Sequence, residues 1–397
     1  MIKSLKFFFT ELPLKKWTLL IVLLILTLLI TIQNINFPVK HFWNGEYTHY
    51  NNYVIFKQSF FHLIENKNLY DFHPSEYGDL YKYSPSFAMI IGLIAWLPDW
   101  AGLFLWNALN IFVLYFAILK LPQIEHRKKV LMIFFMLFEL ILSTQNSQSN
   151  ALMAGLTIWA YNYMEREKPQ WATLMLTLAS FIKIFSLSAC LLVLLYPKRI
   201  KTLSYFVLWF GLIALMPLSI VSFDELWNQY VNWGHLLAND HSDSLGMGIY
   251  QYTAFILPDS INKIMLLLIG IGIILAPLAL IKKQIIPTFR LHYLCLLLLW
   301  VVVFNHKAES PTFIIAIAGC AIWGLHQKKI QGWKQIVMWN CLLLTSFITT
   351  DLCPRFLKEK YLNVYYIKPI MSIVILGIIV WGMMLQVDKE KKVPITN

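Results

Sequence analysis

Long apolar blocks, separated by short polar or charged stretches, run along the whole chain. Blocks such as 17–35 and 101–120 are close to the length of about 20 residues that an α-helix needs to cross a bilayer. Because lipid offers no partners for backbone polar groups, such blocks must form helices. The pattern predicts an all-α fold: a polytopic transmembrane helical bundle, a single integral membrane domain over 1–397, with about 11 to 13 membrane segments.

The composition agrees with this class. Hydrophobic residues make up 58% and charged residues 14% of the 397 positions, and the mean hydropathy is +0.60. A soluble domain carries about 25% charged residues, so a soluble globular protein is excluded. The net charge of +12 does not indicate a nucleic-acid partner, because the basic residues stand in short clusters between apolar blocks, where they orient helices in the membrane.

The basic clusters set a topology. Clusters such as "EHRKK" (125–129) and "PKRIK" (197–201) are expected in the cytoplasm together with both termini. The segments 38–84 and 222–260 are then the two large external loops. The apolar run 17–35 has no small-residue cleavage site and is expected to be a retained anchor.

Two blocks need special treatment in this scheme. The short block 85–97 becomes a partial-depth segment on the outer side; if it spans the membrane instead, the parity of the later helices changes. The block 171–196 must enter and leave at the cytoplasmic face, which predicts two short helices meeting near Lys183.

Several polar features have both a structural and a functional interpretation. "STQNSQSN" (143–150) is either a polar turn or a set of amides suited to sugar hydroxyls. Lys183 lies among apolar neighbours, which usually marks function in a membrane, although a lysine can also extend to the interface. His306, Lys307 and Glu309 offer a base, a cation and an acid, or form an ordinary charged turn. The five cysteines show no ligand spacing, so no metal site, disulfide or cofactor is expected.

The order and spacing of four motifs resemble glycosyltransferase family 87, also called domain of unknown function 2029, within the GT-C superfamily of membrane glycosyltransferases. The first motif, "NYVIF", begins at Asn52 and is followed by Leu69-Tyr70 at the expected distance. The others are "YSP" (83–85), "SQSN" (147–150) with serine for glycine, and "KIFS" (183–186) with serine for proline.

This resemblance implies a reaction. The chain is expected to be a hexosyltransferase that moves a hexose or mannose-like sugar from a polyprenyl-phosphate donor to a hydroxyl of a glycan or glycolipid acceptor. The site is expected on the outer face of the bacterial cytoplasmic membrane, in contact with membrane lipid. A transporter or flippase of lipid-linked saccharide and a catalytically inactive scaffold of the same fold are the alternatives.

The resemblance also assigns residues. The family's pattern has a catalytic aspartate where this chain has Asn52, and an amide cannot accept the proton. The substitute bases, in order of preference, are Asp79, Glu76, Glu46 and His306. The candidates for the donor phosphate are Lys183, Lys307 and Lys82. The candidates for the acceptor or sugar are Asn52, Tyr53, Phe56, Tyr83, Gln148 and Asn150, with the aromatic side chains of the first loop offering flat faces to sugar rings.

Overall fold

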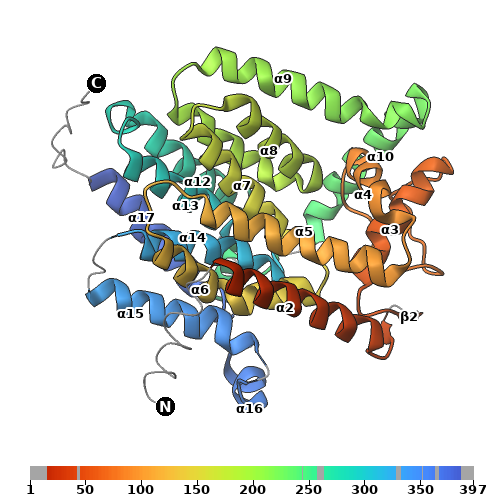
Figure 1. The fold of residues 1–397 in the computed structure, drawn as a ribbon, viewed down its shortest axis with the longest axis horizontal. Coiled ribbons are helices and arrows are strands. Elements are labelled where there is room, and N and C mark those ends of the chain that lie inside the picture. Colours follow the sequence, from red (N-terminus) through yellow and green to blue (C-terminus); the bar gives the residue numbers. More distant parts are fainter. Residues whose placement is uncertain are drawn as a thin grey trace.

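The computed structural model describes residues 16–42, 45–243, 245–256, 263–327, 332–350, 352–362 and 366–385. This part of the chain is almost entirely helical (Figure 1). Its strands form one antiparallel hairpin of β1 (Lys40–Phe42) and β2 (Gly45–Tyr47), with Lys40 opposite Tyr47. The prediction of an all-α membrane protein is confirmed.

The helices follow one another with short connections. The first half of the chain contains α2 (Lys16–Asn36), α3 (Asn51–Ile64), α4 (Pro85–Ala95), α5 (Asp99–Leu119), α6 (His126–Gln145), α7 (Asn150–Met164), α8 (Pro169–Ile182) and the 3₁₀ helix η3 (Ile184–Leu195). The second half contains α9 (Arg199–Leu215), α10 (Phe223–Asp243), α11 (Ile249–Ile256), α12 (Lys263–Leu275), α13 (Pro287–Val303), α14 (Phe313–Leu325), α15 (Gly332–Cys341), α16 (Arg355–Leu357) and α17 (Ile370–Leu385). Single turns lie between them: η4 (Met216–Ser219), η5 (Ala276–Ala279), η6 (Ile281–Lys283), η7 (Ser310–Thr312), η8 (Leu342–Ser346), η9 (Phe347–Thr349) and η10 (Lys358–Leu362).

Three of the described helical segments are long and apolar enough to cross a membrane: 17–36, 99–119 and 199–219. Shorter apolar helices, among them α4, α13, α14 and α17, accompany them. With 11 residues, α4 is roughly 16 Å long and cannot cross a bilayer core of about 30 Å. The total of 11 to 13 segments and the placement of the termini stay predictions, and the terminal residues lie outside the described ranges.

The helices differ in how deeply they are buried. Helices α7 and α14 lie in the interior, and nearly all of their side chains are buried (Figure 1). Helix α7 packs closely on α5, because Gly155 lets the backbone of Leu114 approach: a Cβ at Gly155 would lie 2.8 Å from its nitrogen. Helices α2 and α9 lie at the periphery and expose large apolar side chains, as lipid-facing helices do (Figure 1).

The segment 38–84 is more ordered than predicted. It was expected to be one long loop, but it contains the hairpin and the 14-residue helix α3. Its aromatic side chains recur at helical spacing and pack against α4 and α5: the rings of Phe56 and Trp106 are 5.2 Å apart. The prediction of a loop is wrong, because this aromatic pattern is the buried face of a helix rather than an open binding surface.

The prediction of two short helices meeting near Lys183 is confirmed. Helix α8 ends at Ile182 and η3 begins at Ile184. Lys183 itself has extended backbone angles, φ −137° and ψ 116°, which interrupt the helical path. The side chain of this lysine therefore projects from a break between two helices.

Candidate functional site

A polar turn joins α6 to α7 and forms the centre of the site. Ser147 has a φ of +51°, and its carbonyl accepts a hydrogen bond of 2.8 Å from the indole of Trp106 on α5. The amide of Asn34 on α2 donates to the carbonyl of Gln145 at 3.0 Å. Two other helices therefore hold the turn, which explains how its polar side chains are placed with precision.

A line of hydrogen bonds runs from Lys183 through this turn to Glu309. The ammonium of Lys183 donates to Oδ1 of Asn150 at 2.7 Å, and the amide of Asn150 donates to Oε1 of Gln148. The amide of Gln148 then donates to Oε2 of Glu309 at 2.6 Å. The line connects a cation to an anion through two buried amides, and it joins segments more than 100 residues apart.

Aromatic rings flank Lys183. Its ammonium lies 5.9 Å from the centre of the Tyr83 ring and 5.7 Å from that of Phe185. Glu309, of opposite charge, and Lys82, of like charge, act on it electrostatically. Rings at this distance stabilise a cation, so Lys183 occupies a half-buried position prepared for a charged group.

The "YSP" motif places Tyr83 beside that lysine. The hydroxyl of Ser84 caps α4 by accepting from the backbone nitrogen of Phe87 at 3.1 Å, and it lies 2.5 Å from the carbonyl of Phe181, to which it donates. Phe181 is two residues before Lys183. The start of α4 and the end of α8 are therefore tied together at one point.

Asn52 also reaches this turn. It lies in the first turn of α3, and its amide donates to the carbonyl of Asn146 at 2.9 Å. An amide at this position is thus used as a hydrogen-bond donor, which an aspartate cannot be when it is ionised. The four motifs named in the sequence analysis converge on the polar turn.

A cavity of about 390 Å³ opens beside Glu309. Its lining comprises Lys82, Gly246, Met247, Lys307, Ala308, Glu309 and Ser310. The segment around Gly246 lies directly on the segment after α13: Gly246 has a φ of +56°, and a Cβ there would lie 2.6 Å from the carbonyl oxygen of His306. The cavity therefore brings two lysines and one carboxylate to a common wall.

The sequence offers Glu309 either as an acid beside His306 and Lys307 or as part of an ordinary charged turn, and it is not among the predicted bases. The structure shows a capping box in which its side chain accepts from the backbone of Thr312 and the Thr312 hydroxyl accepts from the Glu309 nitrogen. The order Glu-x-x-Thr is the reverse of the usual Ser/Thr-x-x-Glu signature, so the sequence pattern does not indicate this box. The same carboxylate nevertheless faces the cavity and is exposed.

The three predicted bases of the 38–84 segment, Asp79, Glu46 and Glu76, lie at different places in the structure. Asp79, at a φ of +86°, pairs with Lys82 at 3.1 Å and thus stays next to the cavity wall. Glu46 lies on the hairpin, 66% exposed, and pairs with His41 at 3.4 Å. Glu76 accepts from His62 at 2.8 Å, away from the hydrogen-bonded line.

Of the remaining predicted residues, some lie at the site and others are buried in the core. His306 precedes Lys307 at the cavity and contacts the ring of Tyr250 edge to face. Tyr53 and Phe56 are 0% exposed. They present no free face to a sugar ring, because α3 turns them into the core. Tyr83, by contrast, is half-buried and stands at the site.

A larger cavity of about 1220 Å³ lies elsewhere. Its lining includes Glu165, Tyr196, Arg199 and Arg290, and Arg290 forms an ion pair of 2.6 Å with Glu165. Glu165 directly follows the last residue of α7, whereas Asn150 is the first. The larger cavity is therefore at the opposite end of α7 from the polar turn and contains none of the four motifs.

Comparison with known protein families identifies the chain's family. The sequence model of glycosyltransferase family 87 matches residues 81–325, which is more than half of the chain. The match includes "YSP", the polar turn, Lys183 and Glu309, and begins after Asn52. No curated protein matches the chain.

Proposed function

Because the chain belongs to glycosyltransferase family 87 and is a membrane glycosyltransferase, we propose that it transfers a hexose from a polyprenyl-phosphate donor to a hydroxyl of a glycan or glycolipid. The reaction takes place on the outer face of the cytoplasmic membrane. The observation that carries this proposal is the hydrogen-bonded line from Lys183 to Glu309 beside a cavity with two further lysines.

The lysines account for the leaving group. A polyprenyl phosphate that departs from the sugar gains negative charge, and preplaced cations stabilise that charge most effectively where water is scarce. Lys82 and Lys307 line the cavity, and Lys183 lies half-buried at the far end of the hydrogen-bonded line from Glu309. Three lysines within one site match a phosphate better than they match a neutral sugar.

The amides and Tyr83 account for the sugar. Gln148 and Asn150 are buried side chains with both donors and acceptors, and sugar hydroxyls require both. The ring of Tyr83 is half-buried at the same point. We assign these three residues to the sugar, whereas Tyr53 and Phe56 support them from the core.

The acceptor hydroxyl needs a base, and Asn52 cannot supply one. Glu309 is the best placed carboxylate, because it lines the same cavity as Lys82 and Lys307 and accepts a hydrogen bond from Gln148. Asp79, paired with Lys82 at the edge, is the second choice. The amide at position 52 also favours a second candidate function, an inactive scaffold of the same fold.

The test is a transfer assay with the purified full-length protein in liposomes. Radiolabelled mannose and glucose on polyprenyl phosphate serve as two donors, and a glycolipid extract of the source cells supplies acceptors. Lys183→Met is expected to lower transfer by at least about a hundredfold, since removing one group that stabilises transition-state charge costs that much. Lys183→Arg keeps the charge and is expected to retain more activity.

Lys67→Met is the matched control. Lys67 is 51% exposed, pairs with Glu65 at the surface, and lies in the 38–84 segment, outside the hydrogen-bonded line and the cavity lining. Its loss is expected to leave transfer unchanged. Full activity of Lys183→Met would remove the lysine from the mechanism, and absence of transfer by the unmodified protein from both donors would support the inactive scaffold.

A further inference from the structure

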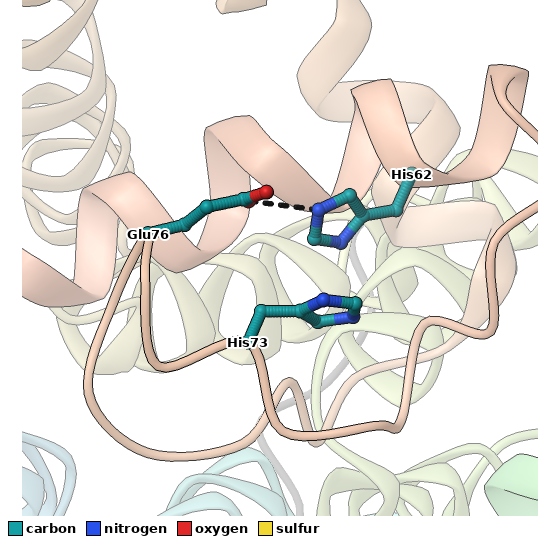
Figure 2. Close-up of side chains that lie close together, drawn as sticks. All are labelled: His62, His73 and Glu76. Atoms are coloured by element: carbon teal, nitrogen blue, oxygen red, sulfur yellow. Dashed lines mark hydrogen bonds and ion pairs between the residues drawn. The ribbon is translucent and has the colours of Figure 1, made fainter.

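Two histidines and a glutamate meet outside the glycosyltransferase site. His62 projects from the last turn of α3, and His73 and Glu76 belong to the loop that follows it (Figure 2). One ligand-type atom from each of the three lies within 4.8 Å of the others. Among the described residues this is the one group of three or more histidine, cysteine or acidic side chains with such spacing.

The geometry is specific. Nε2 of His62 lies 2.8 Å from Oε2 of Glu76, and the rings of His62 and His73 are 4.0 Å apart, tilted by 39° (Figure 2). His62 is 1% exposed, yet its Nδ1 has no hydrogen-bond partner in the part of the chain that the structure describes. A simple hydrogen-bonded pair of His62 and Glu76 leaves this nitrogen without a partner, and His73, whose Nε2 lies 3.3 Å from the carbonyl oxygen of Asn68, packs beside it.

The chemistry of the three groups suits a transition-metal ion. Neutral imidazole and carboxylate are the ligands that Zn²⁺ takes most often besides thiolate. Glu76 is partly exposed, with 30% of its side chain open, so an ion has a path to the site.

We propose that His62, His73 and Glu76 form a binding site for one divalent transition-metal ion, best filled by Zn²⁺. Water completes the coordination. The ion replaces the proton between His62 and Glu76 and draws in the ring of His73. This inference does not depend on the proposed function, because the three residues lie outside the hydrogen-bonded line and the cavity.

The site would fasten a loop to a helix. Other contacts hold the same loop at its edges: the amide of Asn51 brackets Gly78, with bonds of 2.6 and 3.0 Å, and the hydroxyl of Tyr47 donates to the carbonyl of Pro74 at 3.0 Å. The metal would tie the middle of the loop to α3. Because this loop leads directly to Lys82 and Tyr83, a metal here would order the approach to the cavity.

The experiment measures metal in the full-length protein, purified in detergent without a histidine tag and stripped with a chelator. Zn²⁺, Co²⁺ and Mg²⁺ are added separately, and bound metal is counted after gel filtration. About one Zn²⁺ per chain is expected, little Mg²⁺, and visible absorption of Co²⁺ typical of a four-coordinate site. Added Zn²⁺ is also expected to raise the melting temperature.

Three variants decide the assignment. His73→Gln and Glu76→Gln, at partly exposed positions, are each expected to weaken Zn²⁺ binding by at least about tenfold. His62→Gln is less decisive, because a buried substitution alters folding as well. His41→Gln is the control, since His41 is 74% exposed on the neighbouring hairpin, and it is expected to bind Zn²⁺ normally.

Two results overturn the proposal. One is an unmodified protein that binds no Zn²⁺, and the other is equal Zn²⁺ binding by His73→Gln, Glu76→Gln and the unmodified protein. Neither measurement uses a sugar donor, so failure here leaves the glycosyltransferase proposal intact, and the reverse also holds.

Discussion

At the residue scale, the line from Lys183 to Glu309 is directional. Each bond donates toward the carboxylate: the ammonium to Asn150, Asn150 to Gln148, and Gln148 to Glu309. Aligned hydrogen bonds of this kind strengthen one another where the dielectric constant is low. The polar turn therefore fixes the positions of a cation and an anion without a direct ion pair, and leaves both able to act on a bound substrate.

The first prediction at this scale concerns the base. Glu309→Gln is expected to reduce transfer by about a hundredfold to ten-thousandfold, the usual cost of losing a general base. The glutamine side chain can still accept from Gln148 and cap η7, so the fold is kept. Asp79→Asn, at a half-exposed ion pair, is expected to change transfer little. Rates are measured in liposomes, with melting temperatures as the control for folding.

The opposite pattern, a loss with Asp79→Asn and none with Glu309→Gln, would make Asp79 the base. Asn52→Asp is measured beside them. It replaces the donor to the Asn146 carbonyl by an acceptor, so a small loss of stability is expected. A large gain in transfer from this variant would contradict the assignment to Glu309 and indicate that the site has lost an ancestral base.

At the element scale, glycines on α4 and α5 leave the space in which the aromatic side chains of α3 are buried. A Cβ at Gly92 would lie 2.4 Å from the ring of Phe60, and a Cβ at Gly102 would lie 1.8 Å from the hydroxyl of Tyr53. That hydroxyl is buried and has no hydrogen-bond partner among the described residues. The close packing explains how a helix with so many aromatic residues fits between its neighbours.

Gly102→Ala is therefore expected to destabilise the protein by about 1 to 3 kcal/mol, the usual cost of overpacking. Tyr53→Phe alone is expected to be neutral or stabilising, because it removes an unsatisfied buried hydroxyl. The double variant is expected to recover part of the loss. Thermal unfolding in detergent checks all three, and additive effects in the double variant would show that the hydroxyl is not the obstacle.

At the scale of the whole molecule, the two ends of α7 have different chemistry. The polar turn and its carboxylate lie at the beginning, while Glu165, Arg290 and the basic start of α9 lie at the end. The positive-inside rule predicts that the basic end faces the cytoplasm. A buried ion pair lies near the same end of α7 as the polar turn. The ammonium of Lys368, in the segment before α17, lies 3.0 Å from the carboxylate of Glu139 on α6. It also donates a hydrogen bond to the hydroxyl of Ser310, which lines the cavity beside Glu309.

This orientation predicts accessibility from outside intact cells. A cysteine at Asn66, in the exposed turn after α3, is expected to react with an impermeant maleimide. A cysteine at Glu167, 88% exposed in the turn before α8, is expected to react only after the cells are opened. The native cysteines are buried or half-buried and give a low background. Reaction of both positions from outside would refute the orientation.

Much of the fold was predictable from the sequence, because it depends on local properties. The apolar blocks required helices in lipid, and the interruption at Lys183 was visible as a charged residue within an apolar run. The segment 38–84 was less predictable. Its aromatic residues fit either a loop that binds sugar or a buried helical face, and the glycines on α4 and α5 that decide between them lie outside that segment.

For the site too, one part was predictable from the sequence and another was not. The sequence by itself determined which residue types are available: the amides of the polar turn, Lys183, the "YSP" motif and an amide in place of an acid at Asn52. Only the tertiary structure decided that Glu309 joins them and that His62, His73 and Glu76 form a separate group. The physical reason is that metal–ligand bonds and hydrogen bonds act over only about 2 to 3 Å, and packing of the helices, rather than spacing along the chain, brings these side chains within that range.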